Sequence, residues 1–146
     1  MSAALISSRS TTLAFGRKPD GEPWRIGIED PRDTDKIVAT VESAADITVS
    51  TSGDYQRFFE RDGVRYHHIL DPETGMPAAG LRSLTVVGDI PGLDSDILAT
   101  ALFVMGPSAA TVYAEEYGIG LVLVDAEGRT LIVPGPADRT WEIVAE

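Results

Sequence analysis

The stretch SDILATALFVMG at residues 95–106 decides the fold class, because it is the first clear helical pattern after a long series of strand patterns. Its apolar run at residues 97–105 has the length of a helix, and Gly106-Pro107 ends it. Asp94 or Ser95 is expected to cap its first turn. Apolar residues occur on nearly every side of this helix, so we expect it to be buried.

The segments around this helix predict the rest of the domain. A second helix is expected from Ser108, as its cap, to Tyr117, with Gly118 ending it. Strands are expected at residues 5–15 (one strand, or two broken near Arg9), 24–28, 37–41, 47–51, 58–70, 84–87, 119–124, 129–133 and 141–144. Hairpin turns are expected at residues 19–21, 61–63 and 125–128.

This order of elements predicts one domain over residues 1–146, of the α+β class. It should contain a mostly antiparallel sheet of short strands and hairpins, with one central helical pair. A chain of 146 residues that is 43% apolar is long enough to bury its own core.

The chain is acidic, with a net charge of −11 and a pI near 4.5. This charge makes it a poor match for nucleic acid or for an anionic membrane. A phosphate ligand would need a metal ion, backbone N–H groups or a local basic spot to offset the repulsion. The charge therefore restricts how such a ligand is held.

Several kinds of site and location are not expected from this sequence. It has no cysteine, which excludes disulfides, thiolate zinc sites and cysteine nucleophiles. The apolar runs are too short to predict membrane insertion. The first residues lack the pattern of a signal peptide, so the default expectation is a cytoplasmic protein.

Asp96 and Thr100 are the first candidate site residues. They are four residues apart, so their oxygens lie on one face of the helix. A buried carboxylate needs a partner, and a hard cation such as Mg²⁺ is one candidate. Alternatively, Asp96 complements the helix N-terminus while Thr100 bonds a backbone carbonyl, and spacing alone favours this second interpretation.

The segment YHHILDPETG at residues 66–75 holds both histidines of the chain. In a strand His67 and His68 point to opposite faces, so one should face solvent and the other the interior. A histidine at a strand end can accept a proton near neutral pH or stack against a flat ring. A half-buried structural histidine explains the pattern equally well.

The segment TSGDYQRFF at residues 51–59 is the third candidate. Its two hydroxyls, glycine and acid predict a tight turn that brings N–H groups close to a ligand. Ordinary turns share this composition, so the local signal is weak.

Taken together in this order, TSGDY, YHHILDPETGMP (residues 66–77) and DILATALFVMG (residues 96–106) resemble the C-terminal signature of the ApbE family of FAD:protein FMN transferases. The segment GRKPDGEPWRIGIEDPRD (residues 16–33) resembles the same family. Members bind FAD with Mg²⁺, move the FMN moiety to a threonine or serine hydroxyl of a target flavoprotein, and release AMP.

The resemblance implies a role for each matching residue. Asp96 and Thr100 correspond to metal ligands, and His68 to the flavin-contacting histidine, with Ile69 beside it. Ser52 and Gly53 of the TSGDY segment are expected to contact the cofactor. His68 acts either as the base or as a flavin contact.

The chain departs from the family pattern in two ways. Family enzymes are about twice as long, and the family's Gly-Gly followed by Asn or Asp is replaced near Arg9-Ser10-Thr11. The implied partners are therefore a target flavoprotein, a missing N-terminal half or partner chain, and a second copy in a homodimer. The alternatives are a non-catalytic flavin-binding or interaction domain and a truncated, degenerate relative.

Overall fold

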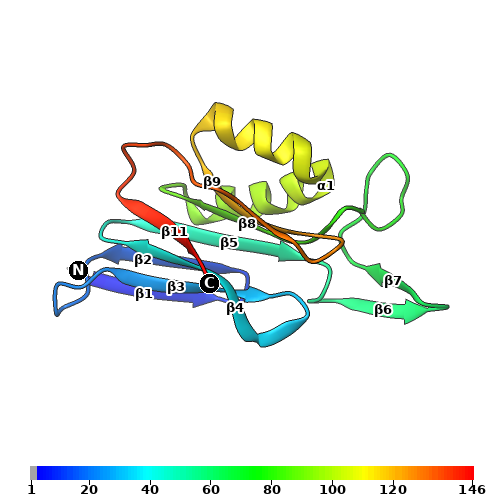
Figure 1. Cartoon of the computed structure of the whole chain (residues 1–146), viewed down its shortest axis with the longest axis horizontal. Helices are drawn as coiled ribbons and strands as arrows, with labels where there is room; N and C mark the ends of the chain where they lie inside the picture. The colour runs from blue at the N-terminus through cyan, green and yellow to red at the C-terminus, as the bar shows by residue number, and fades with distance from the viewer. Residues whose placement is uncertain (1–2) are drawn as a thin grey trace.

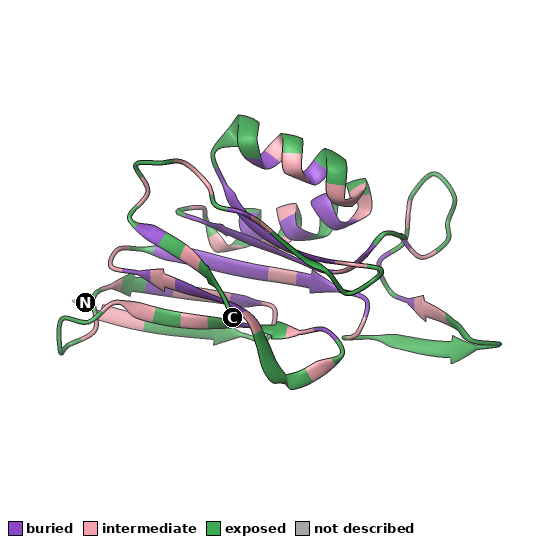
Figure 2. Ribbon diagram, in the orientation of Figure 1, coloured by how far each residue is buried: buried purple, intermediate pink, exposed green. Residues whose placement is uncertain are grey.

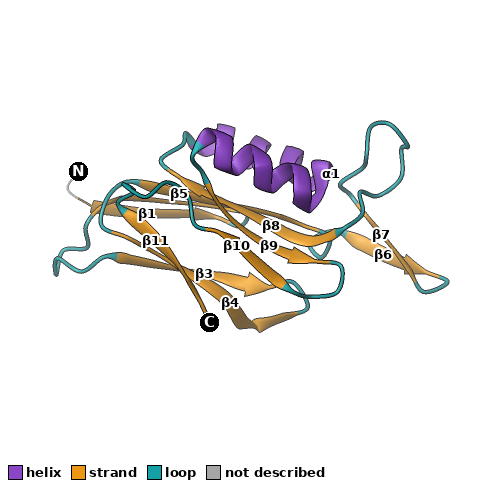
Figure 3. Cartoon of the chain, turned by 45° about the horizontal axis from the view of Figure 1, so that its top comes forward, coloured by secondary structure: helices purple, strands orange, loops and turns teal. Residues whose placement is uncertain are grey.

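The computed structural model describes residues 3–146 and has three layers, with a six-stranded sheet between a helix and a three-stranded sheet (Figures 1 and 3). Its elements follow one another along the chain as β1 (Ala3–Ser8), β2 (Thr11–Gly16), β3 (Trp24–Asp30), β4 (Asp33–Ser43), β5 (Ile47–Gly53), β6 (Phe58–Arg61), β7 (Val64–His67), β8 (Leu81–Gly88), α1 (Gly92–Tyr117), β9 (Gly120–Asp125), β10 (Thr130–Val133) and β11 (Trp141–Ala145).

Every strand pair within these elements is antiparallel. The six-stranded sheet has the order β1-β2-β5-β8-β9-β10, the three-stranded sheet has the order β11-β4-β3, and β6 pairs with β7 alone. This arrangement confirms the predicted α+β class and its mostly antiparallel sheet.

The inner strands β5, β8 and β9 of the six-stranded sheet are buried on both faces, and the alternation along them explains how (Figure 2). On β8, Leu84 and Val86 pack in the core beneath α1, whereas Val87 packs in the core facing the three-stranded sheet. Because successive side chains of a strand point to opposite faces, one continuous apolar strand supplies both cores.

Helix α1 contains both predicted helical segments. Gly106 has non-helical backbone angles (φ 81°, ψ 172°), and Pro107 follows it, so the helix is interrupted where the sequence indicated. Gly118 ends α1 in the left-handed conformation, as expected. The predicted cap is wrong: Pro91 occupies the N-cap position without a side-chain cap hydrogen bond.

The expectation that the helix is buried on all sides is also wrong. Ala99, Leu102 and Phe103 are fully buried against the sheet, but Leu93 and Ile97 are 71% and 59% exposed. By length and apolar composition alone, α1 would be able to cross a membrane, contrary to the sequence expectation. Helices in the core of soluble proteins can share this length and apolar composition.

Two of the three predicted hairpins are present: the chain reverses at Asp62-Gly63 between β6 and β7 and at residues 126–129 between β9 and β10. Residues 5–15 form two strands that are broken at Arg9-Ser10, one of the two alternatives that the sequence left open. The hairpin predicted around residues 19–21 is wrong, because β2 pairs with β1 and β5 while β3 pairs with β4. The connection at residues 17–23 instead carries the chain from one sheet to the other.

Candidate functional site

Asp96 projects from the first segment of α1 toward the turn between β1 and β2. Its Oδ1 atom accepts hydrogen bonds from the Ser10 hydroxyl at 3.1 Å and the Thr11 hydroxyl at 3.0 Å. The partners of this half-buried carboxylate, Ser10 and Thr11, thus lie 86 and 85 positions before Asp96 in the sequence.

Further hydroxyl groups continue this arrangement along β5. The Thr11 hydroxyl lies 3.0 Å from that of Ser50, and the Ser52 hydroxyl lies 2.9 Å from that of Thr100. Thr100 also donates to the Asp96 backbone carbonyl, at 3.3 Å. We call this set the hydroxyl cluster, and it consists of Asp96, Ser10, Thr11, Ser50, Ser52 and Thr100.

The hydroxyl cluster fits a hard divalent cation by the chemistry of its atoms. Within residues 3–146, Asp96 forms no ion pair, and both hydrogen bonds that its side chain accepts come from neutral hydroxyls. A carboxylate with neutral oxygens, completed by water or phosphate, is the ligand set that Mg²⁺ prefers. No group of three His, Cys, Asp or Glu side chains gathers in the described part of the chain, so protein ligands alone do not complete a coordination shell.

The two histidines point to opposite sides, as the sequence predicted. His67 is buried at 8% exposure; its Nε2 atom lies 3.0 Å from the Ala78 carbonyl, and its Nδ1 atom accepts from the Ile69 N–H at 3.3 Å. His67 is therefore the structural histidine. His68 is exposed, and its backbone N–H donates to the Arg57 carbonyl at 3.2 Å.

The side of α1 that carries Thr100 leads toward these histidines. Phe103, one turn after Thr100, meets the His67 ring edge to face at a centroid distance of 5.8 Å. Ile69 is buried in the same core. Along α1, Asp96 therefore contacts Ser10 and Thr11, and Thr100 contacts Ser52. Phe103 then contacts His67, the residue that precedes His68.

The segment TSGDY does not form the predicted turn throughout. Ser52 and Gly53 belong to β5, and the turn begins at Asp54. A side chain at residue 53 would collide with the Tyr55 ring and would lie 3.1 Å from the Arg82 carbonyl oxygen. Gly53 is thus required by protein packing, and the Asp54 N–H donates to that same carbonyl at 2.9 Å.

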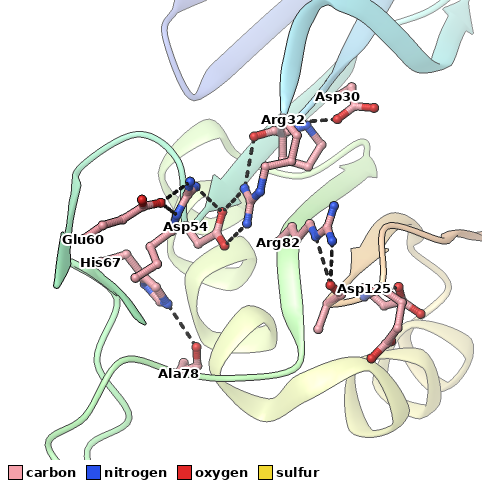
Figure 4. A network of polar contacts seen from close by, with 12 residues as sticks. Asp30, Arg32, Asp54, Glu60, His67, Ala78, Arg82 and Asp125 are labelled. Atoms are coloured by element: carbon pink, nitrogen blue, oxygen red, sulfur yellow. Dashed lines mark hydrogen bonds and ion pairs between the residues drawn. The ribbon is translucent and has the colours of Figure 1, made fainter. Parts of the chain in front are cut away.

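Asp54 is the centre of an ion network that the sequence did not reveal (Figure 4). Both of its carboxylate oxygens accept from the Arg32 guanidinium at 2.6 Å, and Arg65 lies 3.7 Å away. The hydrogen bond to Asp54 is the main reason that the pKa of Arg32 is raised. Arg32 lies between β3 and β4 and Arg65 lies in β7, so no local pattern links them to Asp54.

Two cavities flank these groups. One of about 380 Å³ is lined by Arg32, Asp54, Arg65 and His67 among others. A larger one, of about 560 Å³, includes Ser10 and Arg57 in its lining. Neither is lined by Asp96, Thr100 or His68, so these two cavities do not join the predicted metal ligands to the predicted flavin histidine.

Comparisons with known proteins all point to one family. The family model described as the ApbE family matches residues 1–124. The FAD:protein FMN transferase of Treponema pallidum is 42% identical over 118 residues, covering 80% of this chain and 32% of the relative. That of Escherichia coli K12 is 33% identical over 142 residues, covering 97% of this chain and 38% of the relative.

Solved structures show the same fold. The ApbE protein of Thermotoga maritima matches with a TM-score of 0.80 at 36% identity, over 88% of this chain and 42% of that one. The flavin transferase ApbE of Vibrio cholerae matches with a TM-score of 0.67 at 32% identity, over 97% of this chain and 41% of that one. The chain spans about a third of the length of these curated relatives. It belongs to the ApbE family, a family of flavin transferases.

Proposed function

We propose that this chain carries the metal-binding and flavin-contacting part of an FAD:protein FMN transferase. The reaction moves FMN from FAD to a threonine or serine hydroxyl of a target flavoprotein and releases AMP. The observation that carries this proposal is the half-buried carboxylate of Asp96, which is surrounded by neutral hydroxyls and has no cationic partner among residues 3–146.

Asp96 and Thr100 would hold Mg²⁺, because they place a carboxylate and a hydroxyl oxygen one helical turn apart. The bound ion would offset negative charge on the phosphate oxygens of FAD. This role suits the chain, since a protein with a net charge of −11 otherwise repels a pyrophosphate. The Ser52 hydroxyl lies 2.9 Å from the Thr100 hydroxyl.

His68 would face the reacting groups from the end of the β6–β7 hairpin. Its ring is exposed, while His67 and Ile69 on either side are buried and fix the backbone that carries it. An exposed imidazole can accept the proton of the attacking hydroxyl or stack against the flavin. Ile69, Ser52 and Gly53 complete the cofactor contacts implied by the family motifs.

The proposal is tested by mixing the chain with FAD, Mg²⁺ and an acceptor flavoprotein that carries a reactive threonine or serine. Covalent labelling is read by in-gel flavin fluorescence, and AMP release by chromatography. Because loss of a group that stabilises transition-state charge costs on the order of 10²–10³ in rate, we expect Asp96→Ala to lower labelling by about that factor.

A His68 pair distinguishes the two roles of that residue. His68→Ala should slow labelling whichever role applies, while His68→Phe should retain FAD binding and lose transfer if the imidazole is the base. Labelling that is unaffected by Asp96→Ala would refute the metal role. FAD binding without AMP release would instead support a non-catalytic flavin-binding domain.

A further inference from the structure

The turn between β1 and β2 supplies two hydroxyls to one oxygen of the predicted metal ligand. We propose that Ser10 and Thr11 are positioning residues, which hold the Asp96 carboxylate in the orientation that binds a divalent cation. This inference rests on the proposed function, because it assigns partners to the same carboxylate.

The two hydrogen bonds occupy only one side of the carboxylate. Ser10 and Thr11 both donate to Oδ1, at 3.1 and 3.0 Å. Within residues 3–146, Oδ2 of Asp96 has no hydrogen bond or ion pair. One oxygen is thus fixed by neutral donors while the other stays available to a cation.

The donors are themselves held in place. Thr11 is 9% exposed, and its hydroxyl lies 3.0 Å from that of Ser50, which is fully buried in β5. The Ser10 carbonyl accepts from the Thr51 N–H at 2.8 Å, which ties the turn to the same strand. Arg9 adopts a left-handed conformation (φ 47°), which is costly for a residue other than glycine and persists only where its surroundings enforce it.

Neutral donors suit this purpose better than a cation would. An arginine beside Asp96 would neutralise the carboxylate and compete with a metal, as Arg32 neutralises Asp54. Hydroxyls restrict the rotation of the carboxylate and leave its charge intact. Loss of such outer partners typically weakens metal binding about 10- to 100-fold.

The chain offers a matched control for a direct binding experiment. Ser7 and Thr12 form a hydroxyl pair of the same residue types at 3.0 Å, in the same β1–β2 hairpin but in an exposed position. Mn²⁺ replaces Mg²⁺ as the probe, and the free ion is measured by electron paramagnetic resonance. We expect Ser10→Ala with Thr11→Val to weaken Mn²⁺ binding at least about tenfold, and Ser7→Ala with Thr12→Val to leave it unchanged.

Two further variants separate positioning from folding. Thr11→Ser, with Ser10 left intact, keeps both hydroxyls and should retain Mn²⁺ binding. Ser10→Ala alone changes a turn residue and should weaken binding with little change in the thermal midpoint. Equal Mn²⁺ affinity of the wild type and both hydroxyl-deleted variants would overturn the inference, even if Asp96→Ala abolishes binding and so supports the metal site.

Other outcomes bear on the proposed function itself. If Asp96→Ala binds Mn²⁺ as tightly as the wild type, or if the wild type binds none, the metal role of Asp96 fails and this inference fails with it. If Ser10→Ala with Thr11→Val changes the Mn²⁺ affinity no more than Ser7→Ala with Thr12→Val does, the turn has a structural role only. Each result therefore assigns the failure to one of the two claims.

Discussion

Asp54 and Asp96 are two carboxylates that are shielded from water to different degrees and that have different kinds of partner. Asp54 is 7% exposed, and the two terminal nitrogens of the Arg32 guanidinium donate to its two oxygens. Asp96 is half-buried, and its side-chain partners are the hydroxyls of Ser10 and Thr11. A guanidinium balances the charge of Asp54, whereas only neutral donors meet the Asp96 side chain.

This difference separates a structural group from one that can take a ligand. A desolvated charge is expensive, so a protein that leaves one unpaired is expected to supply a partner from outside. The Asp54 network joins the β3–β4 loop, the end of β5 and the β6–β7 hairpin (Figure 4). Its carboxylate is paired with basic side chains of the protein and needs no outside partner. The hydroxyl cluster joins β1–β2, β5 and α1 without cancelling the charge.

The largest expected effect is on stability, from removing the cation that neutralises Asp54. Arg32→Met keeps an apolar side chain of similar length and leaves a nearly buried carboxylate with Arg65, at 3.7 Å, as its remaining basic partner. Breaking a buried pair costs roughly 3–5 kcal/mol, and we expect the lower end, since the Arg32 side chain is 32% exposed. Urea denaturation measures the loss.

Arg25 provides the control for this variant. It pairs with Glu42 at 2.9 Å but its side chain is 62% exposed. Exposed pairs contribute less than about 1 kcal/mol, so Arg25→Met should have a correspondingly small effect. Equal losses of unfolding free energy from Arg32→Met and Arg25→Met would mean that the Asp54–Arg32 pair stabilises the fold no more than an exposed pair does. The contrast between Asp54 and Asp96 would then fail.

The opposite change tests the second carboxylate. Asp96→Asn keeps an oxygen that can accept from Ser10 and Thr11 and removes the charge. Because no cation is left unpaired by this change, we expect the free energy of unfolding in EDTA to shift by less than about 1 kcal/mol, while Mn²⁺ binding is lost. A loss of several kcal/mol would show that the charge of Asp96 stabilises the fold.

The sequence predicted the fold because its signals are local. The apolar run before Gly106 and the turn glycines at residues 63, 118 and 128 act within a few residues, and every predicted helical segment and strand is present. The failed hairpin at residues 19–21 shows the limit, since a turn signal states that the chain reverses but not which sheet receives the next strand.

Local sequence patterns could not predict which residues that are distant in the sequence would become hydrogen-bond or ion-pair partners. The pairing of Asp96 with Ser10 and Thr11 spans more than 80 positions, and the Asp54–Arg32 pair joins two sheets. Motif resemblance indicated Asp96, Thr100 and Ser52 as one site, and the structure does bring these three together. It gave no indication that Asp54, within the same TSGDY segment, belongs to a different network.

The smallest expected effect concerns Tyr55, which follows Asp54. Burial raises the pKa of the Tyr55 hydroxyl above 10.0, and the negative charges of Glu29 and Asp54 raise it further. The folded protein therefore keeps this proton to a higher pH than the unfolded chain does. The resulting stability is fully present below pH 10.0 and is lost as the pH rises through the folded-state pKa.

Tyr55→Phe should remove this part of the pH dependence. Because phenylalanine has no proton to lose, the difference in unfolding free energy between wild type and variant should be constant below pH 10.0 and move in favour of the variant above it. Parallel curves for the wild type and Tyr55→Phe would mean that Tyr55 ionises as freely in the folded state as in the unfolded chain. The region around Asp54 would then be open to water, which would remove the contrast with Asp96.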